Sequence, residues 1–213
     1  MQPFLFYPVQ KPRFLSQGFG ENLNGAYSTQ GLIGHPGEDF VGDWKSKIYC
    51  AAENSLVTRV INEDNPDPQA YRAVYTIVER NGRYFEITYG HLEVVLVKVG
   101  QVLNPKDIVG LMGNRGMVFS FGREITRAEK EAGSKAATHL HFQVREMLKK
   151  NNGYIQRQPD NGFNSCINPQ PLFTGRYAED YVSYKNNLAT QISLLQKVVG
   201  LLNLWVKKHD ATN

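Results

Sequence analysis

Apolar and polar residues alternate in short runs along most of the chain, and glycine, proline and asparagine separate these runs. An alternation of period two is typical of strands that bury one face in a core. The clearest example spans residues 73–92, where two such runs flank Asn81-Gly82, the pair that best tolerates a type I′ turn. The pattern predicts a hairpin there, within a mainly β fold built as an antiparallel sheet or sandwich. Further strands are predicted at residues 47–61, with a break near Glu53-Asn54, and at 94–103, 107–113 and 139–147.

One short helix interrupts this β pattern just before residue 139. Thr126 and Glu129 have the spacing of a capping box, and Gly133 is a suitable C-terminal stop. The helix either overhangs the residues that follow it or is a surface excursion without a role.

The spacing of apolar residues changes over residues 177–208. Apolar residues recur there at alternating spacings of four and three, at Leu188, Ile192, Leu195, Val199, Leu202 and Val206. This is an a/d seam on a helix, and Val198, Leu201 and Trp205 widen its apolar face. Three interpretations stay open: a helix packed on its own domain, a helix for self-association or docking, and a membrane-surface helix. The change of period predicts a domain over 1–175 and a helical extension over 176–213.

Composition narrows the class of protein. A chain of 213 residues with 41% hydrophobic residues can bury a proper core, which excludes a disordered chain. The net charge of +4 suits an anionic partner, but no block of lysine and arginine predicts nucleic-acid binding. No apolar run is long enough for a membrane span, and the N-terminus does not read as a signal peptide. Cys50 and Cys166 lack metal-site spacing, and whether they pair stays open.

The chain has only five histidines, and two of them alternate with apolar residues in Thr138-His139-Leu140-His141-Phe142. In a strand, His139 and His141 lie on one face, whereas Leu140 and Phe142 lie on the other, toward the core. Neighbouring imidazoles repel each other when protonated, so a cation or hydrogen bonds must keep them neutral. The pair alone is only a weak signal of a metal site.

Two further motifs hold histidines. In "GHPGEDF", His35 and Asp39 are separated by glycine and proline that disfavour a helix, so we predict a tight loop before the strand that begins at Phe40. Imidazole and carboxylate are both common zinc ligands, and spacing alone does not exclude Glu38. His91 ends the second strand of the predicted hairpin, in "YGHL".

Together these motifs resemble the lysostaphin/LytM-type zinc endopeptidases, which cut peptidoglycan cross-links. The resemblance rests on H-x-x-x-D, "YGHL" and "HLHF" in this order, the glycine-bearing turns between them and the closing "INPQPLF", and it covers about residues 15–175. It implies that His35, Asp39 and His141 bind one Zn²⁺ ion and that His91 and His139 are catalytic. Such a site activates a water for attack on a peptide carbonyl. Which of the two remaining histidines is the general base stays open.

Two departures from the family pattern limit this prediction. The segment 114–138 is longer than the usual short turn, so the substrate preference and the bond that is cleaved are not predicted. The helical extension lies outside the family core. A non-catalytic module that binds the wall or activates other hydrolases is the alternative, but all five site residues are present and favour an enzyme. We expect the protein to act at the cell wall or in the periplasm. Its source is either a phage, as a lysis or virion-associated enzyme, or an exported protein of which this chain is a mature or truncated form.

Overall fold

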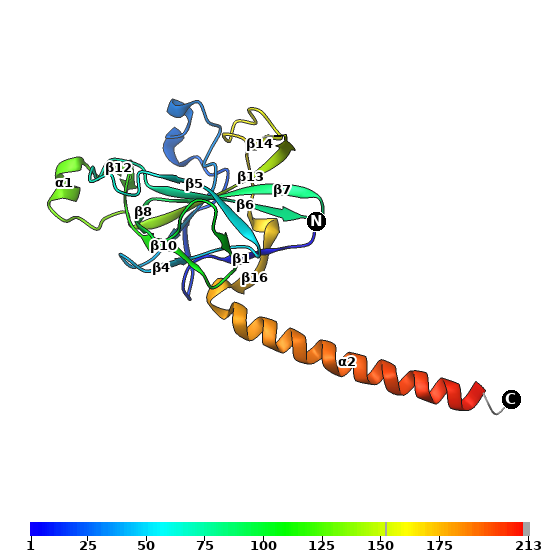
Figure 1. The fold of residues 1–213 in the computed structure, drawn as a ribbon. Helices are drawn as coiled ribbons and strands as arrows, with labels where there is room; N and C mark the ends of the chain where they lie inside the picture. The colour runs from blue at the N-terminus through cyan, green and yellow to red at the C-terminus, as the bar shows by residue number, and fades with distance from the viewer. Residues whose placement is uncertain (152, 211–213) are drawn as a thin grey trace. The chain divides into compact units, whose positions relative to one another are not determined.

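The structure is a computed structural model that describes residues 1–151 and 153–210 (Figure 1). Contacts divide the chain into two units, Met1–Glu179 and Asp180–Asn213, and each is described here by itself. The first unit holds the strands and one short helix, and the second holds the long helix. The mainly antiparallel β fold with a C-terminal helix confirms the predicted fold class.

The strands and helices follow one another in chain order. The strands are β1 (Leu5–Tyr7), β2 (Phe14–Gln17), β3 (Glu38–Val41), β4 (Lys47–Tyr49), β5 (Ser55–Ile61), β6 (Ala73–Arg80), β7 (Arg83–Gly90), β8 (Leu92–Val95), β9 (Val102–Leu103), β10 (Ile108–Met112), β11 (Phe119–Ser120), β12 (Arg123–Glu124), β13 (His139–Lys150), β14 (Gly153–Gln156), β15 (Cys166–Ile167) and β16 (Phe173–Tyr177). The helices are α1 (Arg127–Glu131) and α2 (Tyr181–Asp210), and short 3-10 turns are η1 (Leu23–Gly25), η2 (Ser28–Gln30), η3 (Gln170–Leu172) and η4 (Ala178–Asp180).

The main sheet is built around β13. Its strands follow the order β2-β3-β13-β7-β6-β5-β9, and β14 and β15 pair with β13 as well. All pairings of β13 are antiparallel, and its register places His141 opposite Asp39 on one side and opposite Gly90 on the other. A smaller sheet of order β4-β10-β8, the parallel pair β1-β16 and the antiparallel pair β11-β12 complete the unit. In Figure 1, β5, β6 and β7 lie next to one another beside β13.

The predicted hairpin is confirmed as β6 and β7. Asn81 has a φ of 52° and Gly82 a φ of 74°, so both turn residues adopt the left-handed conformation of a type I′ turn. This turn lets the two eight-residue strands pair over their full length, from Val74 opposite Tyr89 to Arg80 opposite Arg83.

The core lies on the face of the main sheet opposite to His139 and His141. Leu140 and Phe142 are fully buried there, as the alternation along β13 predicts. The ring of Phe142 packs against the rings of Phe40, Tyr89 and Phe173, at centroid distances of 6.2, 5.7 and 5.6 Å. Burial of one large ring is worth about 1.5–3 kcal/mol, so this cluster anchors β13 strongly.

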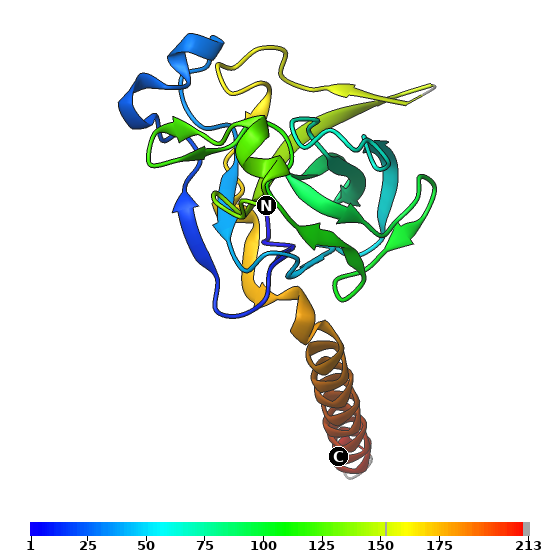
Figure 2. The same ribbon diagram turned by 90° about the vertical axis from the view of Figure 1, so that its left-hand side faces the viewer.

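The short helix α1 begins and ends as predicted. The Thr126 side chain accepts a hydrogen bond from the Glu129 backbone, and the Glu129 carboxylate accepts one from the Thr126 backbone, which completes the capping box. Gly133, with a φ of 90°, follows the last turn. Figure 1 shows α1 and β12 at one end of the main sheet, and Figure 2 looks at the molecule from that side.

The second unit is the helix α2, which has 30 residues. Leu188 of its predicted seam is half-buried, and the seam residues from Ile192 to Leu202 are exposed, with exposed fractions of 64% for Leu195, 54% for Val199 and 57% for Leu202. The side chains of Trp205 and Val206 lie outside the described ones. Among the described residues, no helix combines the length and the apolar content needed to cross a bilayer.

Replacing Phe142 by alanine should destabilise the first unit. The substitution leaves a cavity behind β13, and we expect a loss of about 3–5 kcal/mol in the free energy of unfolding. Phe14→Ala is the matched control, because Phe14 is 62% exposed and its loss should change stability by less than about 0.5 kcal/mol. Chemical denaturation monitored by fluorescence measures both, and equal effects of the two substitutions would contradict the assigned core.

Candidate metal centre

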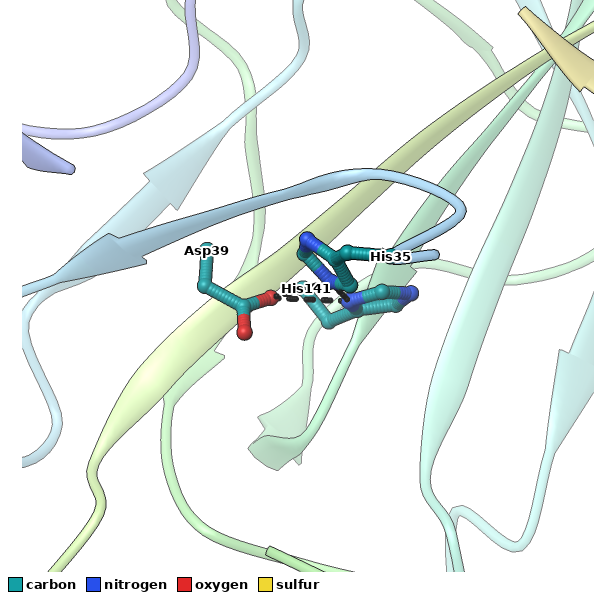
Figure 3. A group of neighbouring side chains, drawn as sticks. All are labelled: His35, Asp39 and His141. Atoms are coloured by element: carbon teal, nitrogen blue, oxygen red, sulfur yellow. Dashed lines mark hydrogen bonds and ion pairs between the residues drawn. The ribbon is translucent and has the colours of Figure 1, made fainter. Parts of the chain in front are cut away.

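Three side chains from separate segments meet beside β13. His35 comes from the loop before β3, Asp39 from β3 and His141 from β13, and Figure 3 shows them pointing toward one another. We expected Asp39 in the loop, but β3 begins at Glu38, so Asp39 lies in the strand. The reason is that Glu38–Val41 pairs with β2 on one side and with β13 on the other, which extends the strand.

The ligand atoms of this cluster are close enough to share one small cation. His35 Nε2 lies 3.0 Å from His141 Nδ1 and 3.2 Å from Asp39 Oδ1, and His141 Nδ1 lies 2.8 Å from Asp39 Oδ1. Zinc bonds of 2.0–2.1 Å in a tetrahedron separate neighbouring ligand atoms by about 3.3–3.4 Å. Two imidazole nitrogens and one carboxylate oxygen at these distances therefore fit a Zn²⁺ ion.

A backbone contact orients His35 for this role. Its Nδ1 lies 3.2 Å from the carbonyl oxygen of Gly18. Because a carbonyl only accepts hydrogen bonds, Nδ1 carries the proton and Nε2 presents a lone pair to the cluster. His35 is 1% exposed, whereas Asp39 and His141 are 13% and 12% exposed. The cluster is therefore mostly buried but open on the side of Asp39 and His141.

Glu38, which spacing alone left as an alternative ligand, lies outside the cluster. It precedes Asp39 in β3, so the two side chains lie on opposite faces of the strand. Its side chain is fully buried, and this burial raises the pKa of the Glu38 carboxyl. Strand geometry thus distinguishes two acidic neighbours that the sequence pattern could not.

The electrostatics of the cluster favour an ionised carboxylate at Asp39 and neutral rings at His91 and His141. Burial acts to raise the pKa of Asp39, but His139 and the hydrogen bonds with His141 and His35 outweigh it and hold that pKa well below its usual range. Burial, opposed by Asp39, lowers the pKa of His141. Burial and the neighbouring His139 and His141 hold the pKa of His91 well below its usual range. Neutral imidazoles and an ionised carboxylate are the forms that bind a metal.

The two remaining predicted site residues lie beside the cluster. The ring centroid of His91 is 4.6 Å from that of His139 and 5.8 Å from that of His141. His91 Nδ1 lies 2.6 Å from the Arg115 carbonyl oxygen, and His139 Nδ1 lies 2.8 Å from the Ala137 carbonyl oxygen. Both rings therefore donate a hydrogen bond from Nδ1, which leaves Nε2 available to a substrate or a water. The structure thus brings all five predicted residues together; their individual roles stay predictions.

The long segment 114–138 supplies these orienting carbonyls from its two ends. Arg115 is held by Glu93 through two hydrogen bonds of 2.9 and 3.1 Å. At the other end, Ala137 has a φ of 56°, a left-handed conformation that is uncommon for alanine. Sequence reasoning missed both contacts, because a backbone oxygen leaves no residue-type signal. The segment therefore contributes to the site through backbone carbonyls that orient His91 and His139.

Comparison with known proteins identifies the family. Residues 34–156, more than half of the chain and including all five site residues, match the model of Peptidase family M23. The protein belongs to this family, which confirms the resemblance to the lysostaphin and LytM type. No curated protein matches the chain.

Three solved structures illustrate the likeness in fold. The antimicrobial peptidase lysostaphin from Staphylococcus simulans is 16% identical, with 83% of this chain and 58% of that chain covered and a TM-score of 0.50. The catalytic domain of a mutant of the prophage-encoded M23 protein EnpA from Enterococcus faecalis is 18% identical, with 79% and 95% covered and a TM-score of 0.46. A zinc-containing peptidase from Vibrio cholerae is 20% identical, with 82% and 41% covered and a TM-score of 0.46.

The metal-free protein should lose stability as the pH falls below about 6.5. The pKa of His91 in the folded protein is well below its usual value of 6.5, so the unfolded chain binds a proton that folded His91 does not. The contribution of His91 to the free energy of unfolding is then fully present above pH 6.5. It declines as the pH falls toward the pKa of His91 in the folded protein, by at most about 1.4 kcal/mol per pH unit. Chemical denaturation of chelator-treated protein at several pH values measures this slope.

The matched variant is His91→Asn, which keeps a donor for the Arg115 carbonyl but does not titrate. We expect a shallower loss of stability with falling pH in this variant. An identical slope in both proteins would mean that His91 takes up its proton in the folded state as readily as in the unfolded chain.

Proposed function

We propose that the protein is a zinc-dependent endopeptidase that hydrolyses peptide bonds in bacterial peptidoglycan cross-links. The observation that carries this proposal is the cluster of His35, Asp39 and His141 at ligand distances, with two further histidines oriented beside it. Membership of Peptidase family M23 supports the class of reaction. The alternative, a non-catalytic module of the same fold, would not require His91 and His139 to be held in this way.

The residues divide into a binding set and a proton-transfer set. His35, Asp39 and His141 would hold one Zn²⁺ ion, which supplies Lewis acidity and makes water nucleophilic near neutral pH. His91 and His139 donate from Nδ1 to backbone carbonyls, so the neutral form of each ring offers a lone pair at Nε2. Either ring can accept a proton from the attacking water and deliver it to the leaving amine nitrogen.

Peptidoglycan is the proposed substrate, and the bacterial wall or periplasm is the proposed place of action. The net charge of +4 suits an anionic wall polymer, because it favours encounter between the two. Asp39, His139 and His141 keep 12–13% of their side-chain surface exposed, enough for a peptide to approach from the open side. A phage lysis or virion-associated role stays a prediction.

Substitution of the five residues should separate metal binding from catalysis. We expect His35→Ala, Asp39→Ala and His141→Ala to lose bound zinc and the release of peptides from purified peptidoglycan. His91→Ala and His139→Ala should keep about one zinc per chain and lose about 100-fold or more in rate, because general acid–base groups contribute this much. Zinc content by atomic spectroscopy and product masses by mass spectrometry are the measurements.

His209→Ala is the control, because it removes the fifth histidine of the chain by the same substitution. We expect it to keep both zinc and activity, and a chelator to abolish activity in the unsubstituted protein. Intact protein that binds zinc but releases no peptide fragments would contradict the enzyme and favour the non-catalytic module.

For α2, we propose parallel self-association with a second copy of the chain. The spacing assigns Ile192 and Val199 to a positions, and Leu188, Leu195 and Leu202 to d positions. β-branched residues at a with leucine at d favour parallel two-stranded coiled coils. The described e and g positions between them, Ala189, Gln191, Gln196, Val198 and Asn203, carry no charge, so no like charges oppose each other across a pair of identical helices.

A lysine in the seam should therefore reduce the mass of the protein in solution. Leu195→Lys buries a charge in the proposed d layer, and we expect it to convert a dimer into a monomer in sedimentation equilibrium. Thr190→Lys is the matched control, because Thr190 is at an f position, away from the seam, and should leave the dimer intact. A monomer at all concentrations for the unsubstituted chain would refute self-association.

A further inference from the structure

Tyr71 lies at the metal centre although no sequence motif marks it. It belongs to the loop between β5 and β6, and its hydroxyl occupies the space where a Cβ atom on Gly90 would be. Gly90 is the last residue of β7 and pairs directly with His141 of β13. Residues paired across antiparallel strands present their side chains on the same face of the sheet. The Tyr71 hydroxyl therefore lies on the face that carries His139 and His141.

The strand register also limits the distance from this hydroxyl to the cluster. Cβ atoms of directly opposed residues lie about 4.5–5.5 Å apart. The Tyr71 oxygen lies 2.1 Å from the position that a Cβ atom on Gly90 would take, so it is within about 7–8 Å of the Cβ atom of His141. Its ring meets the ring of His91 edge to face, at a centroid distance of 5.0 Å and an angle of 83°. A substrate group bound beside His141 is within reach of this hydroxyl.

Among the residues that the structure describes, none forms a hydrogen bond with the Tyr71 hydroxyl. The hydrogen bond recorded for Tyr71 goes to its backbone carbonyl, from Asn62 Nδ2 at 2.8 Å. Tyr71 is half-buried, so its hydroxyl is free to donate a hydrogen bond to a group that binds beside the candidate metal centre.

The surroundings hold Tyr71 in place. Gly116, which has a φ of 85°, packs against its Cα and ring atoms, and a Cβ there would lie only 3.0 Å from Tyr71 Cα. The guanidinium of the next residue, Arg72, donates to the carbonyls of Asn62, Asn65 and Glu93. These contacts hold the loop around Tyr71, so the Tyr71 hydroxyl is preorganised.

The two histidines beside the cluster leave a role for such a donor. His91 and His139 each use Nδ1–H for a backbone carbonyl, so in the neutral state their Nε2 atoms only accept. Attack of water on a peptide carbonyl puts negative charge on the carbonyl oxygen, and that charge needs hydrogen-bond donors. The Tyr71 hydroxyl is a donor on the same face.

We propose that Tyr71 is a catalytic residue that donates a hydrogen bond to the carbonyl oxygen of the scissile peptide bond as negative charge develops on it. This inference rests on the proposed function. As the water oxygen bonds to the carbonyl carbon, the water proton passes to a histidine and the π electrons move to the carbonyl oxygen. Collapse breaks the C–N bond, and the histidine returns the proton to the amine nitrogen.

Tyr71 keeps its own proton throughout this sequence. Burial raises the pKa of its phenol, so the hydroxyl stays a donor at neutral pH and beyond. Its contribution is therefore a hydrogen bond that strengthens in the transition state, not a proton transfer.

Tyr71→Phe tests the proposal in the whole 213-residue chain. The substitution removes one oxygen that no described protein atom binds, so zinc content and the denaturation midpoint should be unchanged. We expect kcat on a peptide fragment containing the cleaved bond to fall by about 100-fold with little change in KM, as for loss of one oxyanion donor. Tyr154→Phe, on the β14 hairpin beside Tyr84, is the control and should keep wild-type kcat.

A second measurement is the affinity for a phosphinate analogue of the cleaved dipeptide, which resembles the tetrahedral state. We expect Tyr71→Phe to weaken binding of this analogue by about the same factor as kcat, while binding of the substrate is unchanged. A kcat within twofold of wild type, or an unchanged kcat with a raised KM, would overturn the proposal. A lower denaturation midpoint would overturn it too, because the hydroxyl would then be structural.

These outcomes are distinct from failure of the proposed function. If the unsubstituted zinc-loaded protein releases no peptide, the enzyme and the role of Tyr71 both fall. If it is active and Tyr71→Phe is equally active, only the role of Tyr71 falls.

Discussion

The antiparallel pairing of β13 with β3 and β7 is the constraint on which the site depends. One register places Asp39 opposite His141 on one side of β13 and Gly90 opposite His141 on the other. A shift of one residue would turn His141 into the core and bring Phe142 to the surface. The burial of Phe142 among aromatic rings makes that shift costly, so hydrophobic packing on one face positions the polar chemistry on the other.

Charge balance is a second condition on the same strands. A buried carboxylate without partners would be protonated, but the imidazoles around Asp39 keep it ionised. In return, burial and mutual repulsion keep His91 and His141 neutral. The site therefore holds a negative charge beside free nitrogen lone pairs before any ligand arrives. Backbone carbonyls of Gly18, Arg115 and Ala137 complete this arrangement by orienting the rings.

Much of this arrangement could be predicted from the sequence, because local rules govern it. Period-two alternation located the paired strands, Asn81-Gly82 identified the hairpin, and Thr126 with Glu129 identified the capped helix. The histidine motifs indicated the cluster of side chains through their resemblance to a known family. The position of Asp39 inside a strand was not predicted, because pairing with two neighbouring strands extends β3 beyond what local propensity indicates.

The sequence by itself determined the fold class, since alternation is a local property, and its motifs indicated the residues of the candidate metal centre through their resemblance to a known family. Only the tertiary structure decided between Glu38 and Asp39, because that choice depends on which face of β3 meets β13. It also decided that Tyr71 reaches the site. Tyr71 belongs to a loop distant in the sequence, and its hydroxyl fits beside Gly90 because Gly90 has no side chain. A contact between such remote segments leaves no periodicity or spacing in the sequence from which it could be predicted.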